Sequence, residues 1–63
     1  MKSPLVSIVI NCFNSERFLN KALNSIYSQT YKNWEIIFWD NLSTDSSPNI
    51  AKSYDQKLKY YRA

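Results

Sequence analysis

The sequence predicts an α/β protein in which strands and helices alternate in the order β-α-β-α-β and the strands pair in parallel. Two observations carry this prediction. Apolar runs rich in β-branched and aromatic residues recur along the chain with helix-patterned segments between them. Polar residues take over where the first two runs end, and the connections are short. Such alternation is typical of a parallel sheet with right-handed crossovers, here the start of a Rossmann-like sheet and an incomplete domain.

The first strand is expected over residues 5–10, and its loop over residues 11–15. Asn14 or Ser15 is placed to cap the next helix by accepting from the free amides of its first turn. Glu16 would lie favourably at the positive end of the helix dipole. Over residues 16–29 apolar side chains recur with the helical period, which predicts an amphipathic helix. The expected apolar stripe consists of Phe18, Leu19, Ala22, Leu23, Ile26 and Tyr27.

The central strand is expected over residues 34–40, where five of the first six positions are apolar or aromatic. This composition indicates burial on both faces, as in parallel strands. Asp40 and Asn41 follow at its carboxyl end, where open α/β sheets bind ligands. Asp40 is therefore a candidate ligand contact or organiser of the site, and the alternative is a carboxylate that only caps the next helix. Strand alternation places Trp39 on the face opposite Asp40.

A second, shorter helix is expected to start near Pro48, because proline fits a first helical turn. A third strand is expected over residues 58–62. If the strands lie in the order three-two-one, right-handed crossovers place both helices on one face of the sheet. The opposite face would then be bare, and we expect the remaining part of a larger domain, a partner or a second copy to cover it.

Composition excludes several classes of function. Cys12 is the only cysteine and there is no histidine, so neither an internal disulfide nor a zinc site is supported, and a reducing, cytoplasmic environment is expected. The net charge of +3 comes from scattered lysines and arginines, which argues against nucleic-acid binding. The chain contains no glycine, which rules out a Gly-rich phosphate-binding loop. No apolar run is long enough to span a membrane.

Three segments together resemble the amino-terminal part of family 2 glycosyltransferases, GT-A-type enzymes that transfer a sugar from a nucleotide donor. The segments are Val6-Ser7-Ile8-Val9-Ile10 with Asn11-Cys12-Phe13-Asn14, then Ser25-Ile26-Tyr27-Ser28-Gln29-Thr30-Tyr31, and Glu35-Ile36-Ile37-Phe38-Trp39-Asp40-Asn41-Leu42-Ser43-Thr44-Asp45. Their order and spacing match the family's signatures over nearly the whole chain. The resemblance implies that residues 1–63 are the nucleotide-binding portion of a glycosyltransferase domain.

The resemblance also implies a donor site at the carboxyl ends of the first two strands. Its substrate-binding residues would be Asn11, Phe13, Asn14, Asp40 and Asn41. Phe13 offers an aromatic face for stacking, and UDP-sugar is the implied donor. The family usually has a second aspartate at the position of Asn41 and a glycine at the position of Leu42. An amide both donates and accepts, which leaves the preference for uracil open. Leucine is strained at a positive φ, so we expect the loop to differ locally.

The family needs a divalent metal, Mn or Mg, held by an Asp-x-Asp motif, and a carboxylate base. No such motif occurs here, so neither a catalytic nor a metal-binding residue is assigned within this chain. The expected function is donor binding in an inverting glycosyltransferase, with the 63 residues inactive alone and the full-length parent associated with the inner face of the membrane. The alternative is a non-catalytic nucleotide-binding or protein-interaction module derived from the same fold.

Overall fold

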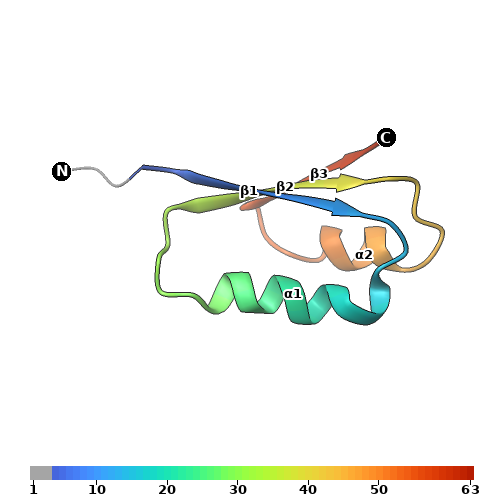
Figure 1. Ribbon diagram of the computed structural model, residues 1–63, viewed down its shortest axis with the longest axis horizontal. Coiled ribbons are helices and arrows are strands. Elements are labelled where there is room, and N and C mark those ends of the chain that lie inside the picture. Colours follow the sequence, from blue (N-terminus) through green and yellow to red (C-terminus); the bar gives the residue numbers. More distant parts are fainter. Residues whose placement is uncertain (1–3) are drawn as a thin grey trace.

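The computed structural model describes residues 4–63 and has the predicted order of elements (Figure 1). Strand β1 spans Val6–Cys12, helix α1 Glu16–Ser28, strand β2 Trp34–Asp40, helix α2 Ser47–Lys52 and strand β3 Leu58–Arg62. The three strands form one sheet in the order β1-β2-β3, and both pairings are parallel. The α/β class and the incomplete Rossmann-like, GT-A-type sheet predicted from the sequence are therefore confirmed.

The register aligns the carboxyl ends of the strands. Cys12 of β1 lies opposite Asp40 of β2, and Asp40 lies opposite Arg62 of β3. Strand β1 is longer than expected, because Asn11 and Cys12 continue the pairing instead of starting the loop. Cys12 is thus a buried strand residue and not a loop residue.

Both helices cover the same face of the sheet (Figure 1). This arrangement follows from the strand order, because each right-handed crossover between adjacent parallel strands passes on the same side. The core lies between the helices and that face and is built on the central strand. Its buried members are Cys12, Leu19, Leu23, Trp34, Ile36, Phe38, Ala51 and Leu58.

The apolar stripe of α1 is narrower than the sequence predicted. Leu19 and Leu23 are buried, whereas Phe18 is 71% exposed and Ala22 is also exposed. The prediction that Phe18 and Ala22 join the stripe is therefore wrong for this structure. Within residues 4–63 the sheet has three strands, so α1 buries little more than the line of residues closest to it.

The face of the sheet opposite the helices is open. Alternation along the strands brings Val9, Ile37, Trp39 and Tyr61 to this bare face, together with an ion pair between Glu35 and Lys59. The Trp39 and Tyr61 rings pack against each other at 5.2 Å, yet each is about two-fifths exposed. Trp39 and Asp40 thus lie on opposite faces, as the sequence predicted.

Candidate functional site at the carboxyl edge of the sheet

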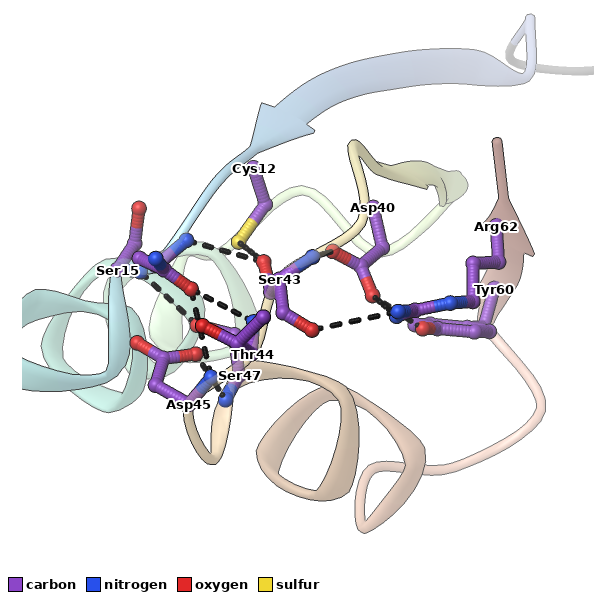
Figure 2. A network of polar contacts seen from close by, with 10 residues as sticks. Cys12, Ser15, Asp40, Ser43, Thr44, Asp45, Ser47, Tyr60 and Arg62 are labelled. Atoms are coloured by element: carbon purple, nitrogen blue, oxygen red, sulfur yellow. Dashed lines mark hydrogen bonds and ion pairs between the residues drawn. The ribbon is translucent and has the colours of Figure 1, made fainter.

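The loops that follow β1 and β2 are interlocked. Asn14 accepts hydrogen bonds through Oδ1 from the backbone N–H groups of Thr44 and Asp45. In the other direction, Ser43 Oγ accepts from Asn14 N at 3.0 Å, and Ser47 Oγ accepts from Ser15 N at 2.9 Å (Figure 2). Each loop therefore supplies the hydrogen-bond acceptors that the other lacks, and the two form one rigid edge.

Helix α1 is capped by the opposite loop and not by its own. The expectation that Asn14 or Ser15 caps it is wrong, because no side chain before the helix accepts from its first turn. Asp45 Oδ2 instead accepts from Glu16 N at 3.1 Å, while its Oδ1 accepts from Ser47 N at 2.9 Å. Asp45 thus serves the amino ends of both helices, where a carboxylate is favoured by the helix dipole. Asp45 is therefore an acid that stabilises the loops.

Asp40 is completely buried and holds three donors from separate parts of the chain. Its Oδ1 accepts from Ser43 N at 2.9 Å. Its Oδ2 accepts from the Tyr60 hydroxyl at 2.5 Å and from Arg62 Nη1 at 2.6 Å (Figure 2). Asp40 caps neither helix, so the structure favours the role of organiser over that of a simple cap.

The electrostatics of Asp40 follow from these partners. Burial alone would raise the pKa of the Asp40 carboxyl, but hydrogen bonds from Ser43 and Tyr60 and the charge of Arg62 outweigh it. Together they lower the pKa of Asp40 from 3.8 to about 2. Burial and the bond to Asp40 raise the pKa of the Tyr60 hydroxyl, so Tyr60 remains a donor at neutral pH. Asp40 is therefore a charged acceptor over the whole physiological range.

Leu42 has a backbone φ of 60°. This is the left-handed region, which glycine enters freely and leucine does not. The expectation that the loop changes locally to avoid a positive φ is wrong, since Leu42 keeps that conformation. Asn14, with a φ of 47°, is the other such residue among positions 4–63, and asparagine tolerates it better. The strain at Leu42 is maintained by the bonds on either side of it.

Replacing Leu42 by glycine is expected to stabilise the chain by about 0.5–1 kcal/mol. Relief of a left-handed leucine yields about 1–2 kcal/mol, and the greater freedom of glycine in the unfolded chain offsets part of it. For a domain of this size this corresponds to a rise in Tm of roughly 2–8 °C in thermal unfolding followed by circular dichroism. Leu5→Gly is the matched control, because Leu5 is equally exposed at 56% but has no positive φ. A Leu42→Gly protein that loses stability as the control does would contradict this reading.

The structure brings the five predicted donor-site residues to this edge, but they have two different roles there. Asn11, Phe13 and Asn41 are exposed, whereas Asn14 and Asp40 are engaged in holding the loops. The N–H of Asn41 donates to Cys12 O at 2.8 Å, which continues the pairing of β1 with β2 one step into the loop. The accessible predicted residues are therefore Phe13 and Asn41 in the loops and Asn11, which pairs with Trp39 and lies on the side of the bare face. The described residues enclose no pocket, so a ligand here would lie on an open edge.

Sequence reasoning missed Ser43, Ser47, Tyr60 and Arg62 as parts of this site. The last two belong to β3, and only the parallel register places them beside Asp40. A signal was available in the sequence, since a strand adjacent to β2 that carries Tyr and Arg two residues apart presents both donors on one face.

The described residues do not fit a divalent metal. Residues 4–63 contain no cluster of three His, Cys, Asp or Glu side chains. Both oxygens of Asp40 already accept from Ser43, Tyr60 and Arg62, and both oxygens of Asp45 accept from backbone amides. No step that depends on a metal is therefore derived for these residues.

Neither helix in this part of the chain is long and apolar enough to cross a membrane.

The fold and this edge define an open α/β protein with its candidate ligand surface beyond the carboxyl ends of β1 and β2. Comparison with known proteins gives the family. The family described as Glycosyl transferase family 2 matches residues 7–63. The chain belongs to family 2 of the glycosyltransferases, as the sequence motifs indicated.

Relatives with similar sequences are described as glycosyltransferases. The chain is 49% identical to the putative glycosyltransferase EpsE of Bacillus subtilis over 51 residues, which are 81% of the chain and 18% of the relative. It is 44% identical to an uncharacterized glycosyltransferase of Rickettsia typhi over 59 residues, which are 94% of the chain and 19% of the relative. The chain therefore spans about one fifth of the length of these two relatives.

Proposed function

We propose that residues 1–63 are the nucleotide-binding portion of an inverting glycosyltransferase that transfers a sugar from a nucleoside diphosphate donor to an acceptor hydroxyl. Family membership supports glycosyl transfer as the general activity. The observation that supports the finer proposal is the interlocked edge, where Asn11, Phe13 and Asn41 are exposed at or just beyond the ends of the adjacent strands β1 and β2. UDP-sugar is the proposed donor, and the chain on its own is proposed to be inactive because residues 4–63 offer neither a metal site nor an assigned catalytic base.

Each exposed residue has a chemical role in this proposal. Phe13 is 61% exposed and offers its ring for stacking on the base, an interaction worth about 1–3 kcal/mol per base. Asn41 pairs with the base edge through its amide, and Asn11 contacts the base or the ribose. An amide presents one acceptor and two donors, so it pairs with uracil and with other bases that alternate donor and acceptor. Asn41 therefore makes the base preference of this site broader than a carboxylate would.

A second function is favoured by the bare sheet face. Val9, Trp39 and Tyr61 are exposed there. Large apolar side chains that are exposed together on one face commonly mark a contact surface. Under this alternative the chain is a non-catalytic module that docks through the bare face. The remaining part of a glycosyltransferase domain or a second copy would cover it.

Titration of the isotopically labelled 63-residue chain with UDP tests the first function. We expect amide shifts confined to residues 11–14 and 40–43, with a Kd in the millimolar range, which corresponds to about 4 kcal/mol. The affinity is expected to be this low because the edge is open and holds no metal. Addition of Mg²⁺ is expected to change the affinity little. CDP and GDP in place of UDP measure the base preference that Asn41 allows.

The outcomes separate the two functions. Shifts at the two loops support the donor site. A folded chain with no shifts up to tens of millimolar UDP contradicts it and favours the docking module. Shifts spread over the bare face instead of the loops would also contradict the proposed site.

A further inference from the structure

Two side chains of β3 reach the loop that carries Asn41. The register pairs Tyr60 with Phe38 and Arg62 with Asp40. The side chains of Tyr60 and Arg62 both reach Asp40 at the end of β2. The Tyr60 ring stacks on the buried Phe38 ring, with 5.9 Å between the ring centres. Lys52 Nζ of α2 lies 4.8 Å from the centre of the Tyr60 ring. This packing fixes the direction of the Tyr60 hydroxyl, which donates to Asp40.

Arg62 bridges both ends of the loop formed by residues 40–43. Its Nη1 donates to Asp40 Oδ2 at 2.6 Å, and its Nη2 donates to the backbone oxygen of Ser43 at 3.3 Å. Asp40 Oδ1 holds the N–H of the same Ser43 at 2.9 Å. A fourth bond, from Ala63 N to Asp40 O at 3.0 Å, ties the backbone of the loop to the end of β3. The backbone N–H and C=O of Ser43 are therefore both held by this clamp, which consists of Asp40, Ser43, Tyr60 and Arg62.

The strained residue of the loop lies inside the clamp. Leu42, with its positive φ, stands between Asn41 and Ser43. A leucine persists in this conformation only where its surroundings over-determine it. The hydrogen bonds at Asp40 and Ser43 supply that constraint, and three of their four donor groups belong to Tyr60 and Arg62 of β3. Removal of these donors is therefore expected to let Leu42 leave the left-handed region.

We propose that Tyr60 and Arg62 are positioning residues of the donor site, which act through Asp40 and Ser43 to hold the 40–43 loop in the turn that presents Asn41 to the base of a nucleoside diphosphate. The ligand in this proposal rests on the proposed function. The clamp itself rests only on the geometry. Arg62 acts in this proposal through the loop, because its Nη1 and its Nη2 each donate one hydrogen bond within the clamp.

The chain offers matched pairs of variants for a test. Tyr60→Phe removes the hydroxyl but keeps the ring on Phe38, so the core is retained. Arg62→Lys keeps the charge but replaces a two-pronged donor with a single point, which cannot hold Asp40 and Ser43 together. The controls are Tyr61→Phe and Lys59→Gln on the same strand. The Tyr61 hydroxyl makes no hydrogen bond within residues 4–63, and Lys59 pairs with Glu35 on the bare face.

Two readouts are needed for each variant. The first is the Kd for UDP, which we expect to rise three- to tenfold in Tyr60→Phe and Arg62→Lys and to stay within twofold in both controls. The second is the Ser43 amide resonance as a function of pH. This resonance follows the protonation of Asp40, because the Ser43 N–H donates to the Asp40 carboxylate. Its midpoint is expected near the wild-type pKa of about 2 and to move up toward 3.8 when a donor to the charged form is removed.

Each outcome decides the proposal. Weaker UDP binding together with a displaced Ser43 resonance supports it. A displaced Ser43 resonance with unchanged UDP binding overturns it, because the turn would then not matter to the ligand. Weaker binding with an unmoved Ser43 resonance also overturns it, because Tyr60 or Arg62 would then contact the nucleotide directly. If the wild-type chain binds no UDP, the proposed function fails, while the Ser43 resonance still shows whether the clamp exists.

Discussion

Replacement of Asp40 by alanine is expected to lower the free energy of unfolding by about 2–4 kcal/mol. The change leaves the buried Ser43 N–H and the Tyr60 hydroxyl without their acceptor, and each such loss costs about 1–3 kcal/mol. The loss of the Arg62 ion pair adds less to this cost, because the Arg62 side chain is 44% exposed and water can solvate the released guanidinium. Asp40→Asn should be intermediate, since it keeps an acceptor for Ser43 but brings an amide toward the donors of Tyr60 and Arg62.

Urea unfolding followed by circular dichroism measures this loss, and Asp55→Ala is the control. Asp55 is also an acid with a lowered pKa, caused chiefly by the hydrogen bond from the Tyr27 hydroxyl. It is exposed, however, and lies near the amino end of β3, away from the candidate site. We expect Asp55→Ala to cost no more than about 1 kcal/mol and to leave UDP binding unchanged, whereas Asp40→Ala weakens it. Equal effects of the two variants on stability and binding would refute the special role of Asp40.

The expected acid response of Asp40 has a definite sign. Its folded pKa lies below its ordinary value, so its stabilising contribution is complete above about pH 4 and is lost as the pH falls toward 2. We expect this contribution of Asp40 to the free energy of unfolding to be about 1–2 kcal/mol, because Arg62 is partly exposed and solvent screens its charge. Asp40→Asn removes this pH dependence, and the loss of slope below pH 4 distinguishes the charge from the shape of the side chain.

The order of the elements was predictable because it depends on local patterns. The apolar runs and the helical period of residues 16–29 follow from side-chain type alone, and the position of both helices on one face follows from the hand of the crossovers. The exposure of Phe18 was not predictable in this way. It depends on how much sheet lies opposite α1, which is a property of the assembled layers and not of the helix.

The residues of the site could be located from the sequence, but their partners could not. Asp40 was found because it ends a buried strand. Its donors Tyr60 and Arg62 lie 20 and 22 residues later, and only the parallel register of β2 with β3 brings them together. The capping of α1 by Asp45 was missed for the same reason. Cap rules consider the residues next to a helix, whereas this acceptor comes from a loop 29 residues away.

The second large effect is expected at Phe38, a fully buried aromatic residue of the central strand. Phe38→Ala should cost about 3–5 kcal/mol through lost burial and the cavity that remains. At roughly 0.05–0.15 kcal/mol per residue, a 63-residue domain has about 3–9 kcal/mol of stability in total. The variant should therefore lose at least about a third of this stability and unfold at a much lower urea concentration than the wild-type chain, as followed by far-ultraviolet circular dichroism.

Trp39→Ala is the control that gives this prediction its structural meaning. Trp39 is larger than Phe38 and adjacent to it, but it lies on the bare face and is 41% exposed. Its packing on Tyr61 is worth about 0.5–1.5 kcal/mol beyond area burial, so the variant should remain folded. A loss at Trp39 as large as that at Phe38 would mean that the bare face is covered in solution. Because a second copy is the partner available to the isolated chain, that loss should then shrink as the protein is diluted, which light scattering at the same concentrations would confirm.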